Sequence, residues 1–425
     1  MAKISRIWAR EILDSRSIPT IEVACKLDNG YIAVSSVPSG TSVGTYEALE
    51  LRDNDQQRYK GKGVLKAVGH INQIIGPGVV GLDPIDQEFL DKKIIGMDGT
   101  ENKSKLGANA ILAVSVVAAK AGAVASQLDL FKWIQKLAKR KGIDSTLKIP
   151  PPVSVVIEGG LHGAGNLDFQ EFFIIPASSK RYSEGLRMIV EIYLSLGENL
   201  KRRGAIHSTG EEGAYAPNLF TNADALEILV ESIRQTQYDL GRDLFLGLDV
   251  AANTLFAGGE YTIRDRSSPL DDNQMLEYYK SLNQQYKFSI LEDPFYEDAW
   301  EAWKKITTAI GDQVTIVGDD LLVTNPKKVD KAIAEAACNA ILVKPNQIGS
   351  VSETLEVIRK SKDAGWKVIV SHRGGETNDS FIADFAVGVG ADFVKFGAPA
   401  RGERVAKYNR LLAIEAQIMP SQSSQ

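Results

Sequence analysis

The stretch from residue 245 to residue 397 most constrains the fold, because it repeats one pattern at least six times. Each unit consists of an apolar run typical of a buried strand, a charged residue at its end, and a segment of helical pattern. The charged residues are, in chain order, Asp249, Glu292, Asp319, Lys344, His372 with Arg373, and Lys395. From Asp249 through His372 to Lys395, successive positions lie 43, 27, 25, 28 and 23 residues apart. These intervals fit a strand, a loop and a crossover helix.

Continuous Val/Ile/Leu runs separated by helical patterns predict buried parallel strands. A doubly wound sheet shares this rhythm, but six consecutive units favour a closed (β/α)8 barrel of the TIM type. Charged residues at the carboxyl ends of several strands are typical of the active face of such a barrel. Before these units, two strand patterns flank a Gly-rich turn (residues 158–166), so we expect an irregular opening to the barrel.

The first part of the chain predicts a smaller α+β domain. Residues 3–37 resemble three antiparallel strands, with a hairpin at Asp28-Asn29-Gly30. Helical patterns follow at residues 64–76, 84–95, 103–126 and 129–141. A chain of 425 residues exceeds one typical core. We therefore predict an α+β domain over residues 1–140 and a barrel domain over residues 141–425, with three prolines (150–152) at the entry to the barrel.

Composition narrows the classes of partner. The net charge is −5 with both signs mixed and no basic stripe, which argues against a nucleic-acid partner. The start of the chain lacks a signal-peptide pattern. The most apolar segment, 108–126, includes Asn109, Ser115 and Lys120, so we expect a buried helix rather than a membrane span. From these two features we expect a cytoplasmic protein.

The carboxylates Asp249, Glu292 and Asp319 would meet at one mouth of the barrel. Two carboxylates about 4 Å apart repel by about 4 kcal/mol at an effective dielectric constant near 20. Three of them require a cation, and ligation by oxygen alone favours Mg²⁺. The alternative is that each caps the helix that follows it. Three acids on one face beside two lysines favour the metal.

Lys344 and Lys395 end buried strands, where a lysine either binds an anion or acts as a base. A base near neutral pH requires the pKa to fall from about 10.4 to about 7–8. A second lysine and a divalent cation would lower it by repulsion between like charges. The structural alternative is a buried ion pair with Asp320 or Glu292, which carries more weight for Lys395 than for Lys344.

Further polar residues complete a candidate site. Arg373 suits a phosphate or carboxylate, His162 lies on the Gly-rich loop, and Glu171 and Glu212 are candidate acids. Residues 39–44 form a small-residue loop that is either a surface connection or a lid. A hard metal, a lysine base, an acid and an anion anchor together fit removal of a proton α to a carboxylate, followed by loss of a leaving group.

At these residues the chain resembles the enolase family over nearly its whole length. The motifs that carry the resemblance are PSGTSVGTYEALELRD, KLGANAILAVS, LEDPFYEDAW, VGDDLLVTNP, VKPNQIGS, SHRGGETND and GAPARGER. The resemblance implies a small α+β domain before an eight-stranded barrel, and reversible dehydration of 2-phosphoglycerate to phosphoenolpyruvate in glycolysis and gluconeogenesis. A lysine base beside Mg²⁺ is an established pattern of enolase-superfamily sites.

The resemblance also implies residue roles. Asp249, Glu292 and Asp319 match the ligands of a first Mg²⁺, and Ser42 matches a ligand of a second Mg²⁺ that is completed with substrate. Lys344 matches the base and Glu212 the acid. The positions that support these groups or bind the small phosphorylated 2-hydroxy acid are Glu171, Lys395, His162, Gln170, His372, Arg373 and Gly374. A homodimer or higher homo-oligomer is expected from the same resemblance.

The chain departs from the family pattern at several positions near the site: Glu158 for asparagine, Glu211 for aspartate, Ala214 for glycine, Pro345 for valine and Gly374 for serine. These departures keep two alternatives to an active enolase open. One is a divergent paralogue that dehydrates a related 2-hydroxy acid. The other is a non-catalytic binding protein that retains the fold.

Overall fold

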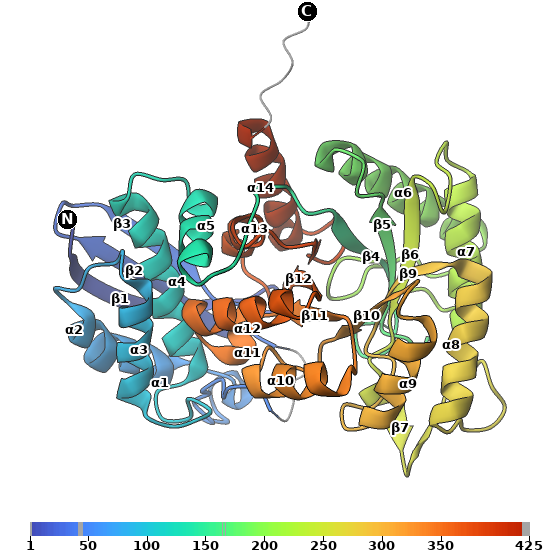
Figure 1. Cartoon of the computed structure of the whole chain (residues 1–425), viewed down its shortest axis with the longest axis horizontal. Helices are drawn as coiled ribbons and strands as arrows, with labels where there is room; N and C mark the ends of the chain where they lie inside the picture. Colours follow the sequence, from blue (N-terminus) through green and yellow to red (C-terminus); the bar gives the residue numbers. More distant parts are fainter. Residues whose placement is uncertain (1, 41–45, 164, 166, 419–425) are drawn as a thin grey trace, which may run out of the picture.

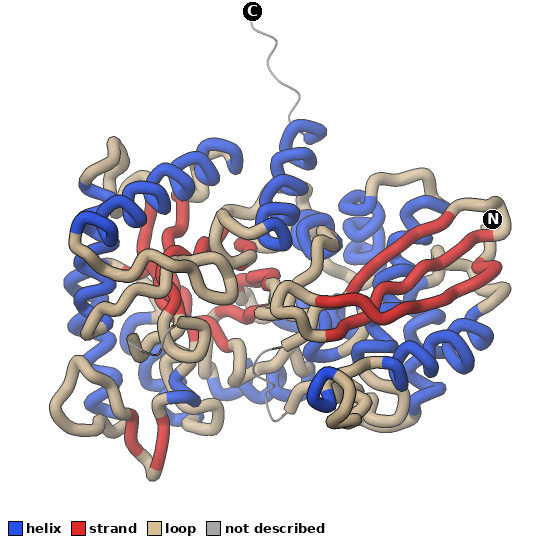
Figure 2. Tube along the Cα trace, turned by 180° about the vertical axis from the view of Figure 1, so that it is seen from behind, coloured by secondary structure: helices blue, strands red, loops and turns tan. Residues whose placement is uncertain are grey.

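The computed structural model describes residues 2–40, 46–163, 165 and 167–418. The chain begins with an antiparallel sheet of three strands in the order β1-β2-β3 (Figure 2). Its strands are β1 (Ile4–Leu13), β2 (Pro19–Leu27) and β3 (Ile32–Ser36). Gly30 has φ +92° in the β2–β3 turn, a conformation that glycine adopts without strain. The predicted strands and hairpin are confirmed.

Helices follow the sheet in the chain, and several of them pack against it (Figure 1). They are η1 (Tyr59–Gly61), the continuous run α1 (Leu65–His70), η2 (Ile71–Ile75) and α2 (Gly76–Val79), then α3 (Gln87–Asp98), α4 (Ala108–Ala125) and α5 (Leu130–Arg140). By length and composition α4 could cross a membrane, but 83% of it is buried inside the protein. It packs against β2 and β3, which confirms the predicted core helix.

A closed barrel of eight strands makes up the rest of the molecule, in the order β10-β11-β12-β13-β4-β5-β6-β9. The strands are β4 (Pro152–Glu158), β5 (Glu171–Pro176), β6 (Leu244–Asp249), β9 (Phe288–Glu292), β10 (Thr315–Gly318), β11 (Ala340–Val343), β12 (Lys367–Ser371) and β13 (Phe393–Lys395). Each charged position of the repeat in the sequence lies at the end of one of the last six of these strands or directly after it. The predicted barrel is confirmed.

The irregular opening has a specific form, because β5 runs antiparallel to both β4 and β6 while the other neighbouring strands are parallel. The reversal has a consequence for the site. Glu171 begins β5, yet it pairs with Asp249 at the end of β6. The start of β5 therefore lies at the same end of the barrel as the carboxyl ends of the parallel strands.

Helices surround the barrel (Figure 1). They are α6 (Tyr182–Arg202), α7 (Asn222–Arg234), α8 (Asp272–Tyr286), α9 (Trp300–Ile310), α10 (Pro326–Glu335), α11 (Pro345–Ile348), α12 (Val351–Asp363), α13 (Phe381–Gly388) and α14 (Gly402–Ile418). Between β6 and α8 lie η3 (Ala252–Thr254) and the short strands β7 (Phe256–Ala257) and β8 (Glu260–Tyr261).

The two parts of the chain share one continuous hydrophobic core. Helix α5 of the first part packs against α13 of the barrel, and Gly388 allows the close approach. A Cβ atom at Gly388 would lie 2.6 Å from Ile134 Cβ. Since the core is continuous, the division into domains at residues 140 and 141 stays a prediction.

Candidate active site

The mouth of the barrel contains a cavity that is lined mainly by polar and charged residues. Most of the residues predicted from strand ends meet there. The lining includes His162, Gln170, Glu171, Glu212, Asp249, Asp319, Lys344, His372, Arg373, Gly374 and Lys395. Glu292 adjoins this space through its contact with Lys395. Ser42 lies outside the described residues, so its predicted role has no structural description.

Lys395 lies at the centre of a buried group of carboxylates. Its Nζ is 2.8 Å from Glu171 Oε2, 3.1 Å from Asp249 Oδ2 and 2.8 Å from Glu292 Oε1. Burial opposes the positive charge, but these carboxylates outweigh it and raise the pKa of Lys395 well above its ordinary value. The ion pair of Lys395 with Glu292, which the sequence left open as an alternative, is therefore present. The other partners of Lys395 are Asp249 and Glu171 rather than Asp320. Lys395 is a fixed cation.

Lys344 follows β11 and pairs directly with Asp319, which follows β10. Burial alone would lower the pKa of Lys344, but the adjoining Asp319 carboxylate raises it. This is the opposite of the shift expected for a base, because the carboxylate outweighs both burial and the repulsion from Arg373 and Lys395. Lys344 can act as a base only when another cation binds Asp319 and compensates the negative charge of its carboxylate.

The acidic groups fit a hard cation. Burial and the charge of Asp249 raise the pKa of Glu292 well above its ordinary value despite Lys395, and burial also raises the pKa of Asp249. These raised pKa values indicate that one lysine does not compensate all of these carboxyl groups when they are ionised. Their donor atoms are all oxygens, the ligands that Mg²⁺ prefers. The residues present therefore fit the predicted metal.

The acids of the mouth lie close enough to affect one another. Asp249 and Glu292 share Lys395, and burial and nearby charges, including that of Asp319, raise the pKa of both. Asp319 also lies with Asp293 and Asp320, with carboxylate oxygens within 4.8 Å of one another, and joint ligation of one Mg²⁺ by Asp249, Glu292 and Asp319 stays a prediction. Asp293 accepts the backbone N–H groups of Asp319 at 2.9 Å and Asp320 at 2.8 Å. Asp293 therefore fixes the end of β10. Its position directly after Glu292, in the motif LEDPF, was the available signal in the sequence.

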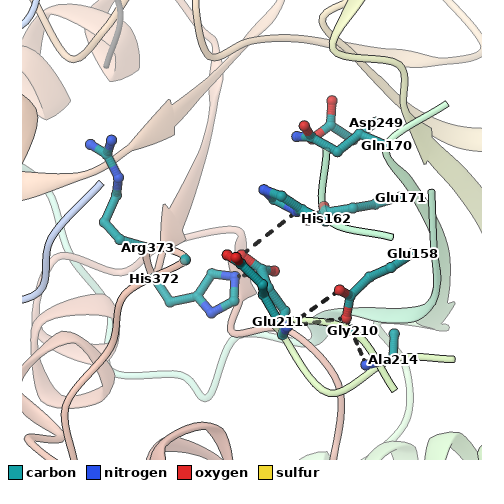
Figure 3. Close-up of polar contacts among 12 residues, drawn as sticks. Glu158, His162, Gln170, Glu171, Gly210, Glu211, Ala214, Asp249, His372 and Arg373 are labelled. Carbon is teal, nitrogen blue, oxygen red and sulfur yellow. Dashed lines mark hydrogen bonds and ion pairs between the residues drawn. The ribbon is translucent and has the colours of Figure 1, made fainter. Parts of the chain in front are cut away.

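A second cluster lies on the β4 and β5 side of the mouth (Figure 3). His162 Nδ1 is 3.0 Å from Glu171 Oε1 and 3.9 Å from Glu212 Oε1. Burial alone would lower the pKa of His162, but the carboxylates of Glu212 and Glu171 raise it to about 9. His162 is therefore a cation at neutral pH. Its positive charge compensates the negative charges of the carboxylates around it.

His372 approaches Glu212 from another direction, with Nε2 2.8 Å from Glu212 Oε2. Its other nitrogen, Nδ1, is 2.9 Å from Arg404 Nη1, which can only donate. Nδ1 must therefore accept and the proton lies on Nε2, in agreement with the burial that lowers the pKa of His372. Burial alone would raise the pKa of Glu212, but the two imidazoles and Arg404 hold it well below its ordinary value.

Two family models match the chain, and together they extend over almost all of it. The model of the enolase N-terminal domain matches residues 4–134, and the model of the enolase C-terminal TIM barrel domain matches residues 146–423. The chain belongs to the enolase family. It is accordingly a lyase of the enolase superfamily; the enolase family is generally Mg²⁺-dependent, and its domains imply a small phosphorylated acid as substrate.

In this enolase-family chain the candidate anion anchor is held by the N-terminal part. Arg373 is 5% exposed, and its Nη1 donates to Glu47 Oε2 at 3.1 Å and Asn346 Oδ1 at 3.3 Å. Gln347 Nε2 lies 3.3 Å from both Glu47 Oε1 and Asp319 Oδ1. Glu47 thus joins the anchor to the acidic residues. Glu47 lies in the motif PSGTSVGTYEALELRD but was not among the site residues predicted from the sequence.

Arg404 is a further residue that was not predicted from the sequence. It is fully buried, and it donates to the backbone oxygens of Arg373 and Gly374, each at 2.6 Å, as well as to His372. Gln170 donates to Asp249 Oδ2 at 3.2 Å, which agrees with a supporting position. The signal for Arg404 was its place in the motif GAPARGER, but a charged residue on a helix of mixed polarity is usually solvated.

Proposed function

We propose that this chain interconverts 2-phosphoglycerate and phosphoenolpyruvate, as an Mg²⁺-dependent phosphopyruvate hydratase. The observation that carries the proposal is that Lys344 and Glu212 line one cavity together with the anion anchor Arg373. Lys344 follows β11, and Glu212 lies on a loop beside β4, with β12 and β13 between them in the ring. A base and an acid on separate strands can act on adjacent carbons of a substrate held by its phosphate.

In the proposed reaction Lys344 takes the proton from C2, and the electron pair of the broken C–H bond moves into the substrate carboxylate. That pair then forms the C2=C3 double bond while the C3 hydroxyl leaves. Glu212 donates a proton to the hydroxyl, so the leaving group is water. Arg373 binds the phosphate, and His162 and His372 orient Glu212.

Asp249, Glu292 and Asp319 would hold the first Mg²⁺, and Ser42 would help to hold a second that is completed with substrate. When bound, Mg²⁺ supplies positive charge that offsets the acids, favours proton loss from Lys344, and stabilises negative charge on the substrate carboxylate. Glu212 is ionised at rest because its pKa is low. The negative charges of the substrate raise its proton affinity, which gives it the proton that an acid needs.

The remaining parts of the proposal follow from the family. We propose a role in glycolysis and gluconeogenesis, a cytoplasmic location, and a homodimer or higher homo-oligomer. Glu171, Gln170 and Lys395 support the metal and the acid, and Gly374 lies beside the bound phosphate.

Proton exchange at C2 and elimination of water can be measured separately, and this distinguishes the role of Lys344 from that of Glu212. Exchange of the C2 proton of 2-phosphoglycerate with solvent reports the base alone, whereas formation of phosphoenolpyruvate requires both groups. We expect Lys344→Ala to lose exchange and elimination, each by about 10²–10⁴-fold. We expect Glu212→Gln to retain exchange and to lose elimination by a similar factor. Exchange that persists in Lys344→Ala would remove the lysine from the role of base.

A further inference from the structure

Glu158 is a buried acid at the end of β4 that the proposed reaction does not use. Its side chain is 1% exposed. Its Oε1 accepts the backbone N–H of Ala214 at 2.8 Å and that of Glu212 at 3.2 Å, and its Oε2 lies 3.3 Å from the N–H of Glu212. Both donors belong to the loop that carries Glu212 (Figure 3). The carboxyl group therefore binds the backbone of the proposed acid itself.

The backbone of this loop is held to β4 at residue 215. The backbone N–H of Glu158 donates to Tyr215 O at 2.8 Å, and that of Tyr215 donates to Val156 O at 3.1 Å. Gly210 N–H donates to Ala214 O at 2.9 Å and closes the loop. The backbone ladder thus fixes residue 215, while the Glu158 carboxyl is the group of β4 that reaches the N–H of Glu212.

The loop fits closely around this carboxyl group. A Cβ atom at Gly210 would lie 2.1 Å from Glu158 Oε2 and 2.6 Å from the backbone oxygen of His162. Any larger residue at position 210 would therefore displace the loop or the Glu158 side chain. Gly213 has φ +91° and lets the chain reverse directly after Glu212.

We propose that Glu158 is a positioning residue that fixes the loop carrying Glu212, so that the acid faces His162, His372 and the cavity. The inference rests on the proposed function, since it assigns a role in the elimination step. Two buried N–H groups without an acceptor would favour a rearranged loop. A displacement of about 1 Å of a catalytic group lowers its step by about 10²-fold.

Glu158 acts here as a hydrogen-bond acceptor. Burial, together with the charge of Glu212, raises the pKa of Glu158 to about 8, so the carboxyl group is mainly protonated at pH 7. Oε1 accepts from Ala214 and Glu212 and Oε2 from Glu212 alone, so in the protonated form Oε1, which makes the shortest bond, is the principal acceptor. Glutamine is the isosteric equivalent of that form and keeps this acceptor, whereas leucine removes it.

The test compares Glu158→Leu and Glu158→Gln in the full-length protein, with 2-phosphoglycerate and Mg²⁺ at pH 7. For Glu158→Leu we expect kcat of elimination to fall about 10²-fold, with KM changed less than about 3-fold and C2 exchange retained. For Glu158→Gln we expect kcat within about 3-fold of wild type. A kcat of Glu158→Leu equal to wild type, or an equal loss of exchange and elimination, would overturn the inference.

Gly210→Ala should also displace the loop that carries Glu212. It keeps the inference testable if the Glu158→Leu variant does not fold. Thermal unfolding and circular dichroism establish that each variant is folded. In folded Gly210→Ala we expect the ratio of elimination to exchange to fall at least about 10-fold, and an unchanged ratio would overturn the inference. A wild-type protein that catalyses neither step would instead overturn the proposed function on which the inference rests.

Discussion

Replacing Lys395 by methionine tests the electrostatic design of the barrel mouth. Lys395 is 4% exposed, and its Nζ lies 2.8–3.1 Å from Glu171, Asp249 and Glu292. Methionine has a similar length and no charge, so the substitution leaves three buried carboxylates facing one another. The protein should respond in two ways, with lower stability and with stronger stabilisation by Mg²⁺.

The magnitude follows from the burial of the pair. Removing one partner of a buried ion pair lowers the free energy of unfolding by about 3–5 kcal/mol. Since Lys395 compensates several carboxylates, we expect the upper part of this range without Mg²⁺. Mg²⁺ at 100 times its Kd stabilises a folded protein by about 2.7 kcal/mol. At one fixed Mg²⁺ concentration the gain should be larger in Lys395→Met, because loss of the lysine charge tightens cation binding.

The assay is urea unfolding of both proteins with Mg²⁺ and with a chelator. Lys407→Met is the matched control: Lys407 is fully buried and lies 2.8 Å from Glu376 Oε2, and among the described residues it forms an ion pair with this one acid. The control should lose stability and gain no more from Mg²⁺ than the wild type does. A Lys395→Met loss below about 1 kcal/mol, or an Mg²⁺ gain equal to that of the wild type, would refute the reasoning.

Two further predictions concern stability away from the site. Burial raises the pKa of Asp91 to about 6 from an ordinary value of 3.8, so its favourable contribution is present below about pH 4 and is lost as pH rises through 6. Asp91→Asn should therefore be more stable than wild type at pH 8, by up to about 3 kcal/mol, and equal to it near pH 4; urea unfolding at both pH values measures this, and a pH-independent difference would contradict it. Gly388→Ala should lower the free energy of unfolding by about 1–3 kcal/mol, because its Cβ would lie 2.6 Å from Ile134 Cβ. Gly96→Ala, where the added Cβ meets nothing within 4 Å on helix α3, should raise it by about 0.5–1 kcal/mol; equal effects of the two glycine substitutions would contradict the packing argument.

The barrel was predictable because its strands are buried on both sides. A strand covered by helices reads as a continuous apolar run, and the charged residue that ends each run marks the mouth. The direction of β5 was less accessible from the pattern. The connection from Glu158 to Glu171 is Gly-rich and lacks a helical pattern, and this was the available signal for an antiparallel neighbour.

The site was predictable in its residue types but not in its pairings. Strand ends identified Asp249, Glu292, Lys344 and Lys395, whereas the sequence could not decide which acid pairs with which lysine. Those pairings depend on side-chain directions within one mouth and not on spacing along the chain. Glu47 was missed for a related reason, because it comes from the N-terminal part and meets Arg373 across 326 positions of sequence.

We propose that this mouth is the active site of an Mg²⁺-dependent lyase that dehydrates 2-phosphoglycerate. The most direct test follows the ultraviolet absorbance of phosphoenolpyruvate as it forms from 2-phosphoglycerate, with Mg²⁺, with a chelator, and after Mg²⁺ is restored. We predict turnover with Mg²⁺, its loss with the chelator, and its recovery. Absence of turnover in folded protein that binds Mg²⁺, or turnover that the chelator leaves unchanged, would contradict the account.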